Sequence, residues 1–296
     1  MRIGLGLPSL TLGVTGSDII DYARLAEDGG LDSLWVIDRI VFDGLEPISV
    51  LSAAAAVTSK VRLGTSVLLA ATREPVMLAK QLATLDVLSQ GRVVLGVGVG
   101  QRENDFQSTG WNYHTRGRRL EDNVNTMRRI WAGESPGDDI GPIGPKPVQK
   151  RIPILFGGAS ERAMTRGARL GDGYIGYMGY TRSQETHESF RKHWRSAGRT
   201  EKPMMMGLAY FYVDEDPQRA KEQARGFIAR YYGARLGFDP ADSAFLGPPQ
   251  AIADGVLFYQ SIGADEMILL PVVSDIAQAK AIIGPVRDLV AKASTH

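Results

Sequence analysis

The sequence predicts an α/β protein with a (β/α)₈ TIM-barrel fold. Short runs rich in Val, Ile and Leu recur along the chain, and each is followed by a longer segment with helical periodicity. Eight such units can be counted, which is the number that closes a barrel. At 296 residues and 44% hydrophobic content, residues 1–296 are expected to form one domain with a large core.

The predicted strands and helices alternate in chain order. The strands are Ile3–Leu7, Ser33–Ile37, Val61–Leu69, Arg92–Val99, Pro153–Phe156, Gly173–Gly176, Met204–Val213 and Glu266–Leu270. Between the first six strands, helices are expected from Ser17-Asp18 to the Gly29-Gly30 stop, then at Pro47–Ser59, Glu74–Ser89, Thr115–Trp131 and Ser160–Leu170; Ser183–Ala197 follows the sixth. Extra helices Pro217–Tyr232 and Pro248–Ile262 occupy the segment 214–262 before the last strand, and Ile276–Ala293 closes the chain.

Residues 133–151 are expected to be an insertion loop. The segment is rich in Gly and Pro, which oppose helix formation. We interpret it as a lid across one face of the barrel.

Composition narrows the classes of function. Lys and Arg number 34 against 33 Asp and Glu, so no overall positive field would hold nucleic acid or an anionic membrane. The chain has no cysteine, which excludes disulfides, thiolate nucleophiles and cysteine-based metal sites. The first residues do not resemble a secretory leader, and charged residues interrupt every hydrophobic run, so we expect a cytoplasmic protein without a membrane span.

The glycine-rich strand Gly96-Val97-Gly98-Val99-Gly100 raises a doubly wound dinucleotide-binding fold as an alternative. That fold needs the spacing G-x-G-x-x-G and a helix that begins at once. Here the spacing is G-x-G-x-G, and some fifteen residues separate the strand from the next helical pattern. The glycines are better explained as positions in a barrel strand where a ligand ring or neighbouring backbone approaches closely.

Candidate functional residues follow the strands, because a TIM barrel assembles its active site from the loops at the C-terminal strand ends. For Asp38 and Arg39 the alternative is an ion pair at the rim without a function. The four histidines show no spacing typical of metal ligands, and no Ser lies in a G-x-S-x-G motif, so neither a metal centre nor a Ser-His-Asp triad is expected. The candidates are Ser9, Asp38, Arg39, Ala71-Thr72-Arg73, Gln101 to Asp105, Tyr177 and Met178.

The segment Gly157-Gly158-Ala159-Ser160 is a candidate anion site. It links a strand to a helix whose first N–H groups carry a partial positive charge, and its glycines let a phosphate come close. Arg162 and Arg166 nearby favour an anion, while an ordinary helix cap remains the alternative.

Two segments resemble the luciferase-like monooxygenase superfamily. They are Thr72-Arg73-Glu74-Pro75-Val76-Met77-Leu78-Ala79-Lys80-Gln81, which continues to Gly91-Arg92, and Leu95-Gly96-Val97-Gly98-Val99-Gly100. The similarity extends to Ser33-Leu34-Trp35-Val36 with Asp38, to Arg116–Glu121, to Gly157-Gly158 and to Leu170–Tyr174.

This resemblance implies a bound flavin-type cofactor, either the deazaflavin coenzyme F-420 or FMN, with its phosphate at residues 157–160. It also implies a non-proline cis peptide at Ser66-Val67 against the ring. In deazaflavin enzymes of this type an Asp and an Asn lie near the ring, and they match Asp38 and Asn104. Where those dehydrogenases carry His and Glu, this chain has Arg39 and Gln101, neither of which can act as a general base at neutral pH.

The favoured function is therefore hydride transfer from F-420 to a C=C or C=N bond of a small organic substrate, with Asp38, Arg39 and Gln101 as catalytic positions. One alternative is an FMN monooxygenase that receives reduced flavin from a partner reductase and uses O₂. Another is a barrel that binds flavin without catalysis. Ser9, Trp111, Tyr177 and Met178 are expected to line the substrate pocket, although Trp111 alternatively packs its own loop. The resemblance also implies a homodimer through residues 47–59 and 74–89.

Overall fold

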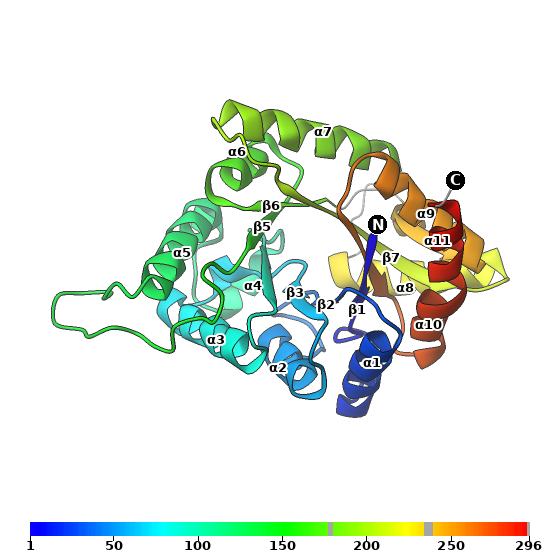
Figure 1. Cartoon of the computed structure of the whole chain (residues 1–296), viewed down its shortest axis with the longest axis horizontal. Helices are drawn as coiled ribbons and strands as arrows, with labels where there is room; N and C mark the ends of the chain where they lie inside the picture. The colour runs from blue at the N-terminus through cyan, green and yellow to red at the C-terminus, as the bar shows by residue number, and fades with distance from the viewer. Residues whose placement is uncertain (177–179, 234–238, 295–296) are drawn as a thin grey trace.

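Eight parallel strands close into a barrel in the computed structural model, which describes residues 1–176, 180–233 and 239–294. Each strand pairs with its neighbours, and closure comes from the pairs β1–β9, β7–β9 and β6–β7. The predicted TIM-barrel class is confirmed (Figure 1). The barrel strands are β1 (Arg2–Gly6), β2 (Ser33–Val36), β3 (Arg62–Thr65), β4 (Val93–Val97), β5 (Ile154–Gly157), β6 (Gly173–Gly176), β7 (Met204–Val213) and β9 (Glu266–Pro271).

Helices surround this barrel, and most begin at a side chain that caps a free N–H group. Thr15 caps the first helix in a capping box with Asp18, two residues before the predicted start, while Glu46, Glu74 and Ser160 cap three others. The helices are α1 (Gly16–Asp28), α2 (Pro47–Val57), α3 (Pro75–Leu88), α4 (Glu103–Ser108), α5 (Arg116–Trp131), α6 (Glu161–Leu170), α7 (Tyr180–Ser196), α8 (Pro217–Tyr232), α9 (Pro249–Ser261), α10 (Ile276–Ala281) and α11 (Arg287–Ala293).

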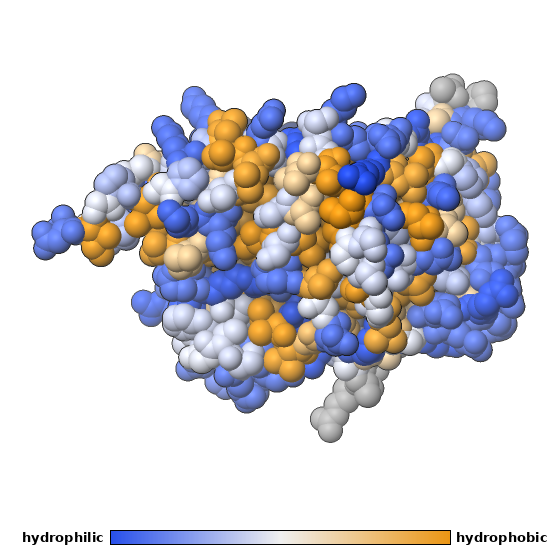
Figure 2. Space-filling view, turned by 90° about the horizontal axis from the view of Figure 1, so that it is seen from below, coloured by the Kyte–Doolittle hydropathy of each residue, from blue (hydrophilic) through white to orange (hydrophobic). Residues whose placement is uncertain are grey.

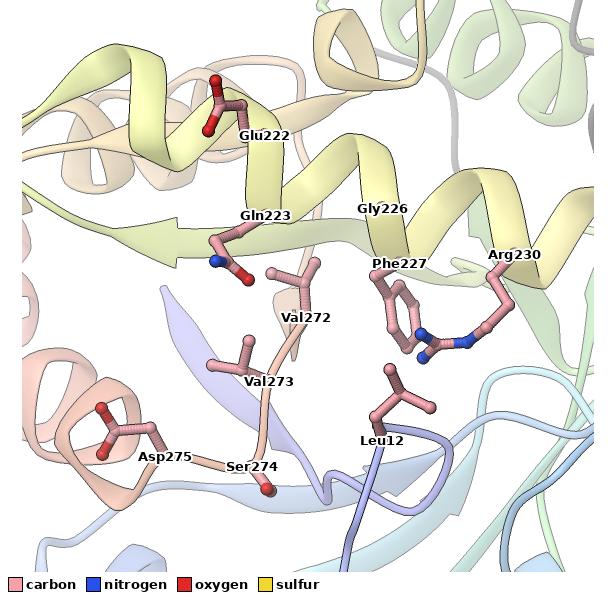
Figure 3. A pocket seen from close by; sticks show the side chains of 10 residues that line it. All are labelled: Leu12, Glu222, Gln223, Gly226, Phe227, Arg230, Val272, Val273, Ser274 and Asp275. Atoms are coloured by element: carbon pink, nitrogen blue, oxygen red, sulfur yellow. The ribbon is translucent and has the colours of Figure 1, made fainter.

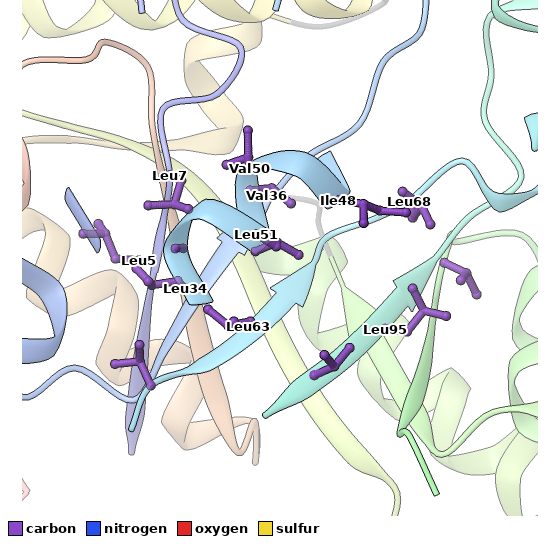
Figure 4. Packing of buried hydrophobic residues seen from close by; sticks show 14 of the residues in the cluster. Leu5, Leu7, Leu34, Val36, Ile48, Val50, Leu51, Leu63, Leu68 and Leu95 are labelled. Atoms are coloured by element: carbon purple, nitrogen blue, oxygen red, sulfur yellow. The ribbon is translucent and has the colours of Figure 1, made fainter. Parts of the chain in front are cut away.

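The core has two layers because successive strand residues face opposite sides. Outward residues of neighbouring strands, among them Leu5, Leu34 and Leu63, pack beneath helices such as α2 with its Leu51 (Figure 4). Inward residues, including Trp35, Val94, Leu155, Ile175 and Met206, fill the barrel interior. The strand ends therefore stand on a packed base.

Two short elements were not predicted. Helix α4 begins six residues after β4 ends, so the long non-helical stretch expected there is wrong. Strand β8 (Ala244–Gly247) pairs with residues 210–213 of β7, because β7 extends beyond its pairing with β6, which ends at Gly207. The closing helix is also divided by a π-helical turn at Ile282–Val286, which contains Pro285.

The expectation that residues 133–151 form a lid over the active site is wrong. The loop is non-helical as predicted, and Figure 1 shows it projecting from the body between α5 and β5. It connects a helix to the following strand, so it lies at the N-terminal end of the barrel. Its Gln149 amide donates to the carbonyl of Val93 at the start of β4, and Arg151 pairs with Asp172 just before β6.

Candidate functional site

The loops at the C-terminal ends of β1 to β5 form a common mouth. Contacts join them in sequence: a carboxylate after β2 binds the chain after β3, and the loop after β3 touches glycines of β4 and β5. The structure thereby gathers most of the predicted site residues at one end of the barrel.

Asp38 after β2 is fully engaged within the protein. Its Oδ2 atom accepts hydrogen bonds from the Leu69 backbone N–H at 2.8 Å and from Arg73 Nη1 at 2.5 Å, and its Oδ1 atom accepts from Arg73 Nη2 at 3.2 Å. Burial alone lowers the pKa of Arg73, but Asp38 and Glu46 more than offset this and raise it above its ordinary value. Asp38 therefore fixes the loop after β3 through its contacts with Leu69 and Arg73.

Arg39 does not form the ion pair with Asp38 that the sequence left open as an alternative. Its Nη1 atom donates to Asp105 Oδ2 at 2.9 Å, and the guanidinium carbon lies 4.4 Å from the centre of the Tyr231 ring. Burial acts to lower the pKa of Arg39, while Tyr231 and Asp105 raise it by more. Arg39 is therefore a permanent buried cation and cannot act as a base.

The peptide bond between Ser66 and Val67 is cis, as the resemblance implied. The Val67 side chain fills the space beside two glycines, Gly98 and Gly157, which have no side chains of their own. A Cβ atom on Gly98 would lie 2.5 Å from Val67 Cγ2, and one on Gly157 would lie 3.0 Å from Val67 Cγ1. The Gly96-to-Gly100 segment thus serves close approach of neighbouring chain, which is one of the two roles expected for it.

Several buried polar atoms at this mouth have no hydrogen-bond partner within the described part of the chain. They are Ser9 Oγ, Arg39 Nε, Ser66 Oγ and Asn104 Oδ1. Buried polar atoms are nearly always paired in folded proteins, so a group of unpaired ones at the strand ends indicates a place for a polar ligand or ordered water.

The Gly157–Ser160 loop leads into α6 as predicted. Gly158 has φ +118°, a conformation that favours glycine, and Ser160 Oγ accepts from the Ala163 N–H at 3.3 Å. Arg166, however, pairs with Glu121 at 3.0 Å, which leaves exposed Arg162 as the nearer available cation. Both the anion site and the ordinary cap remain open for this loop.

The other predicted site residues have different surroundings. Gln101 is exposed, and its carbonyl accepts a hydrogen bond from the Tyr113 hydroxyl. Trp111 is half-buried beneath the Arg119 guanidinium, 3.0 Å from the ring centre, which supports its alternative role in packing the loop. Tyr177 and Met178 lie outside the described residues.

Sequence reasoning missed Tyr231, and it listed Arg73 and Asp105 as candidates without finding their partners at this mouth. Arg73 was noted only for its place after the third strand, and Asp105 as the end of a polar stretch. Tyr231 lies far away in the sequence on α8, yet its hydroxyl donates to the Asp38 carbonyl at 3.1 Å. No local pattern identifies such a contact. In the described ranges, no helix has the length and apolar character needed to cross a membrane.

Comparison with known proteins agrees with this geometry. The model of the family described as luciferase-like monooxygenase matches residues 6–292. An F420-dependent glucose-6-phosphate dehydrogenase of Kineococcus radiotolerans is 32% identical over 230 residues, covering 70% of this chain and 67% of the relative. An uncharacterised protein of Mycobacterium tuberculosis is 37% identical over 172 residues, a match that covers 55% of this chain and only 61% of the relative. A solved F420-dependent secondary alcohol dehydrogenase, in complex with an F420-acetone adduct, has a TM-score of 0.83 at 20% identity, covering 98% of both chains.

Proposed function

This chain belongs to the luciferase-like monooxygenase family, and from that premise we propose that it is an oxidoreductase dependent on the deazaflavin coenzyme F-420. The reaction is hydride transfer to an electron-poor C=C or C=N bond of a small organic substrate. The observation that carries this proposal is the set of unpaired buried polar atoms around the Ser66-Val67 bulge. Relatives named as F420-dependent glucose-6-phosphate dehydrogenases support the choice of deazaflavin over flavin.

The residues at the mouth fit such a cofactor. Ser66 Oγ and Asn104 Oδ1 are buried without partners, so a heterocycle with polar edges would satisfy them. Val67 lies against Gly98 and Gly157 and would offer an apolar surface to a cofactor bound there. The Gly157–Ser160 loop would hold the phosphate at the start of α6.

When bound, F-420 supplies the hydride chemistry, and the protein supplies position and electrostatics. Asp38 holds the loop after β3 through Leu69 and Arg73, and so would keep the Ser66-Val67 bond in place against a bound cofactor. Arg39 places a permanent positive charge at the mouth, where it stabilises negative charge that develops on a substrate. Because Asp38 is paired and Arg39 keeps its proton, we infer that the proton comes from water or from another group in the pocket.

An FMN monooxygenase supplied by a partner reductase is the second candidate. It is favoured by the engagement of Asp38 and Arg39, since oxygen chemistry in a dry pocket does not require either of them to release a proton. A flavin-binding barrel without catalysis is the third candidate. The three functions differ in cofactor preference and in turnover, and both can be measured.

Titration of the cofactor-free protein with F-420 and with FMN, followed by fluorescence, tests the proposal. We expect F-420 to bind more tightly and its reduced form to be oxidised when an enone or imine is added. Tighter binding of FMN together with oxygen consumption would overturn the proposal and favour the FMN monooxygenase. Tight cofactor binding without turnover on a broad substrate panel would favour the flavin-binding barrel without catalysis.

Asn104→Ala should weaken F-420 binding about tenfold, because it removes one hydrogen bond in a buried site. Asn125→Ala is the matched control: Asn125 is exposed on α5 and should leave the affinity unchanged.

We also propose that the chain forms a homodimer through α2 and α3. Support comes from large apolar side chains exposed on α3, namely Met77, Val87 and Leu88, beside the projecting loop with Ile140. Figure 2 shows hydrophobic residues interspersed with hydrophilic ones on the face it displays. Light scattering should give twice the chain mass, and Leu88→Asp should reduce it. A monomer at micromolar concentration would contradict the proposal.

A further inference from the structure

A pocket of about 510 Å³ lies beside the mouth, between α8 and the loops that follow β1 and β9 (Figure 3). We call it the α8 groove. Its centre is apolar, with Phe227 of α8 facing Val272, Val273 and Leu12. Leu12 is 66% exposed, an unusual position for a leucine beside a concave surface. Gly226 leaves one wall open, since a Cβ atom there would meet nothing within 4 Å. The groove suits an apolar molecule.

The charges in the α8 groove are separated. Arg230 lies at one end with Phe227 and Leu12, while Glu222 and Asp275 lie toward the other (Figure 3). Within the described residues no carboxylate pairs with Arg230, whose guanidinium carbon is 5.6 Å from the centre of the Phe227 ring. Asp275 is already engaged as the cap of α10. One unpaired guanidinium attracts a monoanion, whereas the two carboxylates oppose a more highly charged phosphate ester.

The α8 groove adjoins the mouth, because side-chain contacts link the two along one face of α8. The Phe227 ring stacks on Tyr231 with 6.1 Å between centres. Tyr231 in turn lies beneath Arg39 and donates its hydroxyl hydrogen to the carbonyl of Asp38. The wall of the groove formed by Phe227 is therefore one side chain away from the loop that carries Asp38 and Arg39.

We propose that the α8 groove binds the non-reacting end of the substrate, and that the substrate is an apolar organic monoanion recognised by Arg230. The identity of this molecule as the substrate rests on the proposed function, whereas binding of an apolar anion in the groove does not. The apolar walls and the two carboxylates, Glu222 and Asp275, argue against a sugar phosphate as ligand. We therefore expect this chain to differ in substrate class from the relatives named for glucose 6-phosphate.

The binding test uses two probes that share one aromatic skeleton and differ by a sulfonate group, 8-anilinonaphthalene-1-sulfonate and neutral N-phenyl-1-naphthylamine, with the cofactor-free protein. Arg230→Gln should weaken the sulfonate about tenfold and leave the neutral probe unchanged, since one charge-assisted contact is lost. Lys221→Gln removes the same charge from an exposed position on the same helix and should change neither affinity. Gly226→Leu should weaken both probes by filling the groove, and Leu raises helix propensity at this site.

The anion site would be overturned if the wild type and Arg230→Gln bound the sulfonate with equal affinity. It would also be overturned if Arg230→Gln and Lys221→Gln lost affinity equally. Circular dichroism and thermal unfolding show whether each variant is folded. Glucose 6-phosphate at millimolar concentration should not displace the sulfonate probe, and displacement would contradict the stated ligand class.

The substrate arm uses protein supplied with reduced F-420, and enones supplied in pairs, as a terminal carboxylate and as its methyl ester. The acid should have the higher kcat/KM, and Arg230→Gln should raise KM for the acid about tenfold with little change in kcat. Equal rates for acid and ester would overturn the substrate class. If F-420 does not bind but Arg230→Gln still weakens the sulfonate, the proposed function is wrong and the anion site stands.

Discussion

Asp105→Asn tests the buried ion pair that holds the loop after β2. The Asp105 side chain is fully buried, and its Oδ2 atom accepts from Arg39 Nη1 at 2.9 Å. Its Oδ1 atom accepts from the backbone N–H groups of Ile40 at 3.2 Å and Val41 at 2.8 Å. An asparagine that keeps these two backbone contacts points its NH₂ group at the guanidinium, so the variant loses an attraction and gains a clash between two donors.

The expected loss is large because a cation is left buried without a counter-charge. Removing one partner of a buried ion pair costs about 3–5 kcal/mol, and retention of the backbone contacts places this variant near about 3 kcal/mol. The double variant Asp105→Asn/Arg39→Gln should recover part of that loss, since the unpaired charge is gone. Glu134→Gln is the control: its pair with Arg129 at 2.7 Å has side chains 54% and 61% exposed and should contribute about 0–1 kcal/mol.

Urea unfolding followed by circular dichroism measures these free energies on the four proteins. F-420 titration then shows whether the loop still supports the mouth, and we expect about tenfold weaker binding in Asp105→Asn. A loss in Asp105→Asn within about 1 kcal/mol of that in Glu134→Gln would refute the reasoning, as would a double variant no more stable than Asp105→Asn alone.

Three further predictions concern a titrating group, a close contact and a loop. Burial lowers the pKa of His187 from 6.5 to about 4, so between these values the unfolded chain binds a proton that the folded chain does not, and about 3 kcal/mol of stability should be lost as pH falls from 6.5 to 4. Urea unfolding at several pH values measures how steeply the free energy of unfolding falls as pH falls. His187→Asn should flatten this dependence, and the exposed control His114→Gln should retain it. Equal dependence in all three proteins would contradict the assignment to His187. Gly98→Ala should destabilise the protein by about 1–3 kcal/mol, because the new methyl group would collide with Val67 Cγ2. Adding Val67→Ala should restore stability in the double variant. Absence of this rescue would show that Val67 is not the cause of the loss. Deletion of residues 136–141 should leave F-420 affinity within about twofold because the loop is at the opposite end of the barrel, and a tenfold loss would contradict that placement.

Local patterns in the sequence were sufficient for most of the architecture. Alternation of short apolar runs with helical segments predicted all eight barrel strands, because each pattern reflects burial within one element. The glycines at 96–100 indicated a close approach by a ligand or by neighbouring backbone, and the family resemblance indicated the cis Ser66-Val67 bond beside Gly98. The position of the projecting loop was predicted wrongly, because its Gly and Pro content indicated a lid, whereas a connection from a helix to a strand lies at the N-terminal end of a TIM barrel.

Pairing at the mouth was decided only by the tertiary structure. Asp38 and Arg39 are neighbours in the chain, yet Asp38 binds Arg73, 35 residues away, and Arg39 binds Asp105, 66 residues away. Consecutive residues leave a strand end in different directions, so barrel closure brings each to a different loop. The groove on α8 arises in the same way, because Leu12, Phe227 and Val273 meet only after β1, β7 and β9 lie side by side. A sequence pattern records the face that one element buries, whereas a site at the strand ends depends on which elements become neighbours.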